Sequence, residues 1–149
     1  MTRIMFICHG NICRSPMAEY IMKELVRREG ADEKFEIASC AVSTEEIGNG
    51  IYPPAKKELE RRGIPFGKHY AVQLKRSDAD KYDHFIVMDQ SNLRRAREIL
   101  GDGCEGKLHK LMEFAGSQRD VSDPWYSRRF DIAFDDIMHG CEGLLKELI

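Results

Sequence analysis

The sequence predicts an α/β fold, because short apolar runs alternate along it with amphipathic segments. The apolar runs at residues 3–7, 35–39, 84–89 and 107–111 have the length and composition of buried strands. Strands that alternate with helices are typical of a parallel sheet covered by helices on both faces. The sequence shows no internal repeat, low-complexity stretch or linker, so we expect one domain over residues 1–149.

The first strand is expected at residues 3–7, just before a helix. Proline favours the first turn of a helix, so Pro16 indicates where this helix begins, with Ser15 before it as a candidate N-cap. Gly30 ends the helical pattern, and the second strand is expected at residues 35–39.

The rest of the chain continues the alternation. A helix is predicted over residues 53–63, and residues 84–89 form the clearest interior strand. A helix over residues 90–101 and a weaker strand at 107–111 follow. The last helix is expected over residues 128–148. Its predicted apolar face consists of Phe130, Ile132, Phe134, Ile137, Met138, Leu144 and Leu145.

Composition excludes several classes of protein. The 23 Lys and Arg residues against 25 Asp and Glu residues give a net charge of −2, which argues against a nucleic-acid partner. No stretch has the length of a membrane span or the form of a secretory signal, so we expect no membrane association. The number of cysteines is odd and their spacing is irregular, which favours a reducing cytoplasm over a disulfide framework. No Cys or His spacing matches a zinc site. These cysteines are Cys8, Cys13, Cys40, Cys104 and Cys141.

The segment "CHGNICRSP", residues 8–16, lies between the first strand and the first helix. In open parallel sheets, ligands bind beyond the carboxyl ends of the strands. Cys8 lies at this end of the first predicted strand and Asp89 at this end of the third, so both are expected at one edge of the sheet. A loop that leads into a helix N-terminus can direct several backbone N–H groups at one anion.

The residue types in this loop suit a phosphate and a nucleophile. Gly10 and Asn11 tolerate the unusual backbone angles of an anion-binding loop. The guanidinium of Arg14 can hold two oxygens of a phosphate, and the same positive field favours the thiolate of Cys8. Ser15 is placed to donate a hydrogen bond to this thiolate. A lone cysteine after a strand is most often a small core residue, but the ordered Gly, Asn, Arg, Ser and Pro favour a phosphate site.

A second candidate segment is "SDPWYS", residues 122–127. Transfer of a phosphoryl group from a poor leaving group needs a proton donor, and Asp123 is the candidate general acid. Trp125 and Tyr126 can form an aromatic wall for a ring on the substrate. Taken alone, this segment would be interpreted as a turn with a packed tryptophan. Its functional interpretation depends on the presence of the cysteine loop elsewhere in the chain.

With these motifs the sequence resembles the low-molecular-weight protein-tyrosine phosphatases over nearly its whole length. "CHGNICRSPMAE" fits the C-x5-R-S loop of that family, and "DPWY" fits its acid loop. "GIPFGKHYAVQL" and "DHFIVMDQSNL" also agree. The resemblance implies a three-layer flavodoxin-like fold, of the phosphotyrosine phosphatase I-like type, with a four-stranded parallel sheet. It further implies a metal-independent phosphatase without a cofactor.

The resemblance assigns the chemistry by position. Cys8 matches the nucleophile that forms a phosphocysteine, Arg14 the phosphate-binding arginine, and Asp123 the general acid and base. Trp125 and Tyr126 match the aromatic side of the substrate pocket. The residues that match the backbone cradle for phosphate are His9, Gly10, Asn11, Ile12 and Cys13.

Further positions match supporting residues of the family. Asn11 and Ser15 match residues that brace the loop, and His69 and Asp89 match a hydrogen-bond network behind it. Cys13 matches a second cysteine that traps the oxidised nucleophile as a reversible disulfide. The implied partners are phosphotyrosine-containing proteins or peptides, with inorganic phosphate as product and inhibitor, and the chain is expected to be a monomer or weak dimer.

The chain also departs from the family pattern. Glu45 aligns with a wall of the pocket where the family often has an aromatic residue, and the nearest aromatic residue here is Tyr52. Glu45 and Glu46 would repel acidic residues beside the phosphotyrosine, which predicts a preference for basic ones. Cys40 stands where a small residue is usual. After "DPWY" the family often has glycines, whereas this chain has Ser127, Arg128 and Arg129.

Three alternatives remain at this stage. A phosphoarginine phosphatase of the same fold tends to have threonine where Ile12 stands and to lack the pair Trp125 and Tyr126. An arsenate reductase needs two further cysteines on a mobile segment, and none lies between Lys81 and Asp102. A phosphate-binding sensor without turnover would lack the nucleophile or the acid, and both are present here.

Overall fold

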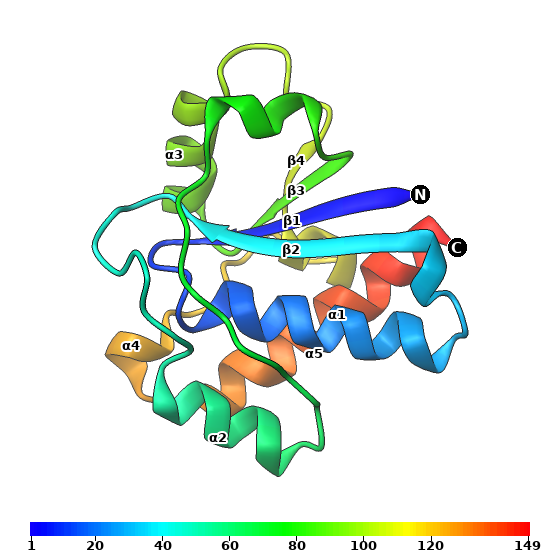
Figure 1. Cartoon of the computed structure of the whole chain (residues 1–149), viewed down its shortest axis with the longest axis vertical. Helices are drawn as coiled ribbons and strands as arrows, with labels where there is room; N and C mark the ends of the chain where they lie inside the picture. Colours follow the sequence, from blue (N-terminus) through cyan, green and yellow to red (C-terminus); the bar gives the residue numbers. More distant parts are fainter.

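A four-stranded parallel sheet forms the centre of the molecule (Figure 1). The structure is a computed structural model and describes all residues 1–149. The strand order is β2-β1-β3-β4, with β1 in the interior of the sheet beside β2 and β3. The strands are β1 (Thr2–Cys8), β2 (Phe35–Ala41), β3 (His84–Val87) and β4 (Leu108–Lys110). This order confirms the predicted flavodoxin-like α/β fold with a four-stranded parallel sheet.

Helices cover both faces of the sheet, which gives three layers (Figure 1). On one face α1 packs against α5, with α2 beside them, and α3 covers the other face. The α-helices are α1 (Arg14–Arg28), α2 (Pro53–Arg61), α3 (Gln90–Leu100), α4 (Pro124–Ser127) and α5 (Phe130–Leu148). The 3-10 helices are η1 (Asp32–Lys34), η2 (Arg76–Asp80) and η3 (Leu111–Ala115). None of the helices combines the length and apolarity that crossing a membrane requires.

The alternation of side chains along β1 divides the core into two parts. Ile4 and Phe6 face the layer of α1 and α5, whereas Met5 and Ile7 face the layer of α3. Cys8 continues the first series, so its side chain points to the α1 side at the carboxyl end of the strand. The sheet therefore fixes the direction of this thiol before any loop contact is made.

Several predicted boundaries differ from the structure by one or two residues, and three of these differences affect how the site or the core is built. The first helix begins at Arg14 with Cys13 at the N-cap position, so Ser15 lies inside the helix and is not its N-cap. The third strand ends at Val87 instead of residue 89, because the carboxylate of Asp89 accepts the backbone N–H of Asn92 and caps α3.

The last helix begins at Phe130 instead of residue 128. Ile132, predicted on its apolar face, is 41% exposed. It lies two residues after the buried Phe130, and two residues turn a helix by more than half a revolution. Most of the predicted face is buried, with Phe134, Ile137 and Leu144 in the core.

Candidate active site

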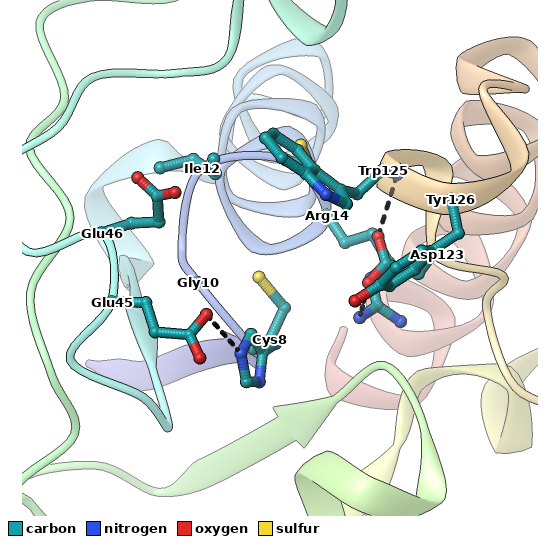
Figure 2. Close-up of a pocket in the computed structure, with 11 residues that line it drawn as sticks. Cys8, Gly10, Ile12, Arg14, Glu45, Glu46, Asp123, Trp125 and Tyr126 are labelled. Atoms are coloured by element: carbon teal, nitrogen blue, oxygen red, sulfur yellow. Dashed lines mark hydrogen bonds and ion pairs between the residues drawn. The ribbon is translucent and has the colours of Figure 1, made fainter.

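Cys8 lies at the base of a pocket formed where β1 leads through the loop 9–13 into α1 (Figure 2). Its Sγ accepts a hydrogen bond from the backbone N–H of Asn11 at 3.3 Å and lies 3.0 Å from the hydroxyl oxygen of Ser15. Because Ser15 is not an N-cap, its hydroxyl is free to contact this sulfur. Both contacts can stabilise negative charge on the sulfur.

The loop is held in shape mainly through Asn11, which is fully buried and has a φ of 60°. Its side-chain amide donates to the hydroxyl oxygens of Ser15 at 2.8 Å and Ser39 at 3.0 Å. Its amide oxygen accepts the N–H of Val72, and its backbone carbonyl lies 2.7 Å from Nε2 of His69. Asparagine tolerates the left-handed region, and these contacts fix it there.

Gly10 has a different use from the predicted one. Its φ is not positive, so the expected need for left-handed freedom applies only to Asn11. A Cβ on Gly10 would lie 3.3 Å from Cγ of Glu46, which is closer than an ordinary contact. The glycine therefore lets the loop approach the segment that carries Glu46.

Arg14 is almost fully buried and lies beside the thiol. Its Nη1 donates to the carboxylate of Asp89 at 2.8 Å and to the carbonyl of Val121 at 2.9 Å, and its Nη2 lies 3.4 Å from a carboxylate oxygen of Asp123. Burial alone would lower the pKa of Arg14, but the negative charges of Cys8, Asp123 and Asp89 outweigh it and raise the pKa. The guanidinium is thus a fixed cation at the pocket floor.

Asp123 lies at the N-terminus of the short helix α4, opposite the cysteine loop (Figure 2). One oxygen of its carboxylate accepts the N–H of Trp125 at 3.0 Å, and the other faces Arg14. The rings of Trp125 and Tyr126 are exposed on the same side of the pocket, and Trp125 packs on Tyr52 with ring centroids 4.8 Å apart. The structure thus brings the predicted acid and aromatic pair beside Cys8.

Two carboxylates form the wall of the pocket opposite Trp125 (Figure 2). These are Glu45 and Glu46, and Glu45 lies 3.0 Å from Nε2 of His9. The cavity has a volume of about 350 Å³. Its lining comprises Cys8, His9, Gly10, Ile12, Cys13, Arg14, Glu45, Glu46, Asp123, Trp125 and Tyr126.

The remaining predicted residues fall behind this lining. His69 contacts the loop through Asn11, and Asp89 both fixes Arg14 and caps α3. All five cysteines are free thiols. Cys13 lines the pocket itself, and its pKa is raised to about 12, mainly by burial and then by the negative charge of Cys8. No group of three or more His, Cys, Asp and Glu side chains is arranged to hold a metal ion.

A family model decides what these motifs represent. The model described as low molecular weight phosphotyrosine protein phosphatase matches residues 3–149. The chain belongs to this family. The match spans both the cysteine loop and the segment of Asp123, so the two halves of the site belong to one family pattern.

Known proteins agree with the family. The chain is 33% identical to the low molecular weight protein-tyrosine-phosphatase YfkJ of Bacillus subtilis, over 99% of this chain and 96% of that protein. The crystal structure of YfkJ superposes with a TM-score of 0.95 at 34% identity, covering 99% of this chain and 94% of that one. A protein tyrosine phosphatase from Entamoeba histolytica gives 0.94 at 26% identity, covering 99% and 97%. A Drosophila arginine phosphatase gives 0.90 at 24% identity, covering 99% and 98%, which shows the shared fold alone.

Some residues of this low molecular weight phosphatase site were not found from the sequence. Ser39 donates to a carboxylate oxygen of the buried Glu19 at 2.6 Å and thereby supports Asn11 from β2 and α1. A serine at an inward position of a strand is the one signal that pointed to it. Outside the pocket, Tyr52 contacts Trp125 and Arg128, which both follow Asp123 closely in the chain, and no sequence pattern indicated these contacts.

Proposed function

We propose that this chain hydrolyses phosphotyrosine in proteins and peptides, and small aryl phosphates, through a phosphocysteine formed on Cys8. The single observation that carries the proposal is the convergence of Cys8, Arg14 and Asp123 on one pocket. Membership of the phosphotyrosine phosphatase family supports the same activity. The residues 1–149 then act as one phosphatase domain.

The first step transfers the phosphoryl group to sulfur. The Sγ of Cys8 attacks phosphorus, and an S–P bond forms as the bond between phosphorus and the phenolic oxygen breaks. The guanidinium of Arg14 and the loop N–H groups hold the charge on the phosphoryl oxygens. Asp123 gives its proton to the leaving phenolate, which would otherwise depart as a strong base.

The second step returns the enzyme to its starting state. Water attacks the phosphocysteine and gives a proton to the carboxylate of Asp123, which is now the base. The S–P bond breaks, inorganic phosphate leaves, and the thiolate of Cys8 keeps the electron pair. The hydroxyl of Ser15, 3.0 Å from the sulfur, stabilises this leaving thiolate.

The pocket supports an aryl substrate without a cofactor. Ile12, Trp125 and Tyr126 offer apolar and aromatic surface above the phosphate position, and every reacting group in the two steps is a side chain of this chain or water. The proposal includes phosphotyrosine proteins as partners and inorganic phosphate as product and competitive inhibitor. A monomer or weak dimer in the cytoplasm remains the expectation.

A panel assay tests the proposal. The wild type is expected to hydrolyse phosphotyrosine peptides in preference to phosphoserine and phosphoarginine peptides, and Cys8→Ser is expected to abolish turnover. Acid quenching during turnover should trap phosphorus on Cys8, detectable by mass spectrometry. A preference for phosphoarginine would favour the alternative that shares this fold, and absence of any turnover would favour a phosphate sensor.

A further inference from the structure

Arg128 ends the helix α4 in an unusual backbone conformation. Its φ of 60° and ψ of 12° lie in the left-handed region, and only one other non-glycine residue, Asn11 of the cysteine loop, has a positive φ. A residue with a side chain stays in this region when surrounding contacts hold it there. The contacts of the Arg128 side chain should therefore show which parts of the structure hold the residue in this conformation.

The guanidinium of Arg128 contacts two aromatic rings and two oxygen acceptors. Its Cζ lies 5.4 Å from the ring centroid of Tyr52 and 5.6 Å from that of Phe130. Its Nη2 donates to the hydroxyl oxygen of Tyr52 at 3.2 Å, and its Nη1 donates to the carbonyl of Trp125 at 3.3 Å. No carboxylate pairs with it, whereas the next residue, Arg129, pairs with Asp131.

Tyr52 connects this contact to the cysteine loop. Its backbone N–H donates to the carbonyl of Ile12 at 2.9 Å, and its ring packs against Trp125. Arg128 therefore joins the end of the segment that carries Asp123 to a residue bonded directly to the loop of Cys8. A surface arginine without a structural role would not be expected to bridge these two parts of the pocket.

The other end of the same segment is also fixed. The N–H of Val121 donates to the carbonyl of Met88, and the carbonyl of Val121 accepts from Arg14. We call residues 121–128 the acid segment. Asp123 lies between the two attachment points, so its distance from the reacting atoms depends on both.

We propose that Arg128 is a positioning residue that clamps the acid segment to Tyr52 and thereby holds Asp123 and Trp125 over the cysteine loop. The inference rests on the proposed function, because Asp123 is the proton donor there. Arg128 itself touches neither substrate nor the reacting atoms. It acts by restricting where the acid segment can lie.

Two substitutions separate the side chain from the backbone conformation. Arg128→Gly removes the clamp and leaves a residue that adopts a positive φ freely, so the turn is retained. Arg128→Ala removes the clamp and keeps the backbone strain. Arg129→Ala is the matched control, because Arg129 is the adjacent cation and its side chain pairs with Asp131 instead of hydrogen-bonding to Tyr52.

The first measurement needs no catalysis. Trp125 is the only tryptophan of the chain and lies on the acid segment, so its fluorescence reports the position of that segment. Acrylamide should quench Trp125 more strongly in both Arg128 variants than in the wild type or Arg129→Ala. Quenching of Arg128→Gly equal to the wild type would overturn the clamp, whatever the activity of the protein.

The second measurement is the dependence of kcat/KM on the leaving group, since kcat/KM reports transfer to Cys8. A displaced acid should lower kcat/KM about tenfold for phosphotyrosine, whose phenol has a pKa of about 10, and much less for phenols of low pKa. Arg129→Ala should match the wild type. Equal losses for all leaving groups in both Arg128 variants would contradict the positioning role, whereas a wild type without turnover would contradict the proposed function instead.

A double-mutant cycle tests the partner residue. Tyr52→Leu removes the ring and hydroxyl that Arg128 contacts, so its effect on quenching should add little to that of Arg128→Gly. Full additivity of the two changes would show that Arg128 and Tyr52 act independently and would overturn the proposed clamp.

Discussion

At the scale of single residues, Cys8 and Cys13 line the same cavity but have different surroundings. The Sγ of Cys8 accepts a backbone N–H and lies beside the hydroxyl of Ser15 and the fixed cation of Arg14. Burial, and then the negative charges of Cys8 and Asp123, together raise the pKa of Cys13 to about 12. Since the thiolate is the nucleophile, the two thiols should differ greatly in reactivity.

We expect iodoacetamide at pH 7 to alkylate Cys8 at least about tenfold faster than Cys13. The sites are identified by peptide mass spectrometry after short exposures. Inorganic phosphate should protect Cys8, because it occupies the same loop, while a chloride control at equal ionic strength should not. Equal labelling of both thiols would contradict this assignment of the nucleophile.

The carboxylates of Glu45 and Glu46 give the pocket a second, charge-based property. They form the wall opposite Trp125, where they would face residues that flank a bound phosphotyrosine (Figure 2). An exposed charge pair contributes up to about 1 kcal/mol, so a lysine beside the phosphotyrosine should raise kcat/KM about fivefold over a glutamate. The double variant Glu45→Gln, Glu46→Gln should remove this preference.

The measurement compares kcat/KM for matched peptides that differ only in the flanking charge. High salt should reduce the preference in the wild type, because salt screens exposed charges. A preference that persists in the double variant would show that other residues set it. Turnover of a small aryl phosphate, which has no flanking residues, serves as the control for the chemistry itself.

At the scale of elements, the sheet and main helices were predictable because each has a local signal. Apolar runs gave the four strands in order, and proline and glycine marked the ends of the helices. The short helix α4 was not predicted, because four residues carry no periodicity and its N-cap, Asp123, was assigned only a chemical role. The N-cap assigned to Ser15 was wrong because the helix starts one residue earlier than Ser15, at Arg14.

The packing of α5 on η3 gives a prediction for one glycine. A Cβ on Gly143 would clash with the carbonyl oxygen of Phe114, a backbone atom that cannot shift without cost. Alanine in an exposed helix normally stabilises by about 1 kcal/mol relative to glycine, but overpacking costs about 1–3 kcal/mol or more. We therefore expect Gly143→Ala to lower the free energy of unfolding by about 1–2 kcal/mol.

Urea denaturation measures this change, with Gly106→Ala as the control. A Cβ on Gly106 meets no atom within 4 Å and its φ is not positive, so this variant should stay within about 0.5 kcal/mol of the wild type. An increase in stability for Gly143→Ala would mean that α5 and η3 do not pack as closely as described.

At the scale of the whole molecule, the site joins parts of the chain that local patterns cannot bring together. The residues of the cysteine loop were predictable because they are consecutive between a strand and a helix. The contact of Arg14 with Asp123 joins residues 109 positions apart, and its contact with Asp89 joins residues 75 apart. The family resemblance supplied their roles, but the contacts of Tyr52 and Arg128 depend on tertiary packing that no pattern encodes.

An anion bound by Arg14 and the cysteine loop would contact residues that several elements hold in place, so its binding should stabilise the whole fold. A ligand that binds only the native state adds about 2.7 kcal/mol at a concentration of 100 times its Kd, which corresponds to a rise in Tm of about 5–10 °C for a chain of this size. We expect inorganic phosphate to give this rise by differential scanning calorimetry. Cys8→Ser should retain most of it, since binding uses Arg14 and loop N–H groups, not the sulfur.

The variant Arg14→Lys shows whether the phosphate-dependent rise in Tm needs the guanidinium geometry or only a positive charge at this position. Lysine keeps the positive charge beside Asp89 but cannot offer the paired N–H groups that match two phosphate oxygens. We expect this variant to fold with a Tm close to that of the wild type and to lose most of the rise with phosphate. An equal rise in both proteins would mean that phosphate stabilises this molecule from another site, and the convergence of its elements on Arg14 would not explain anion binding.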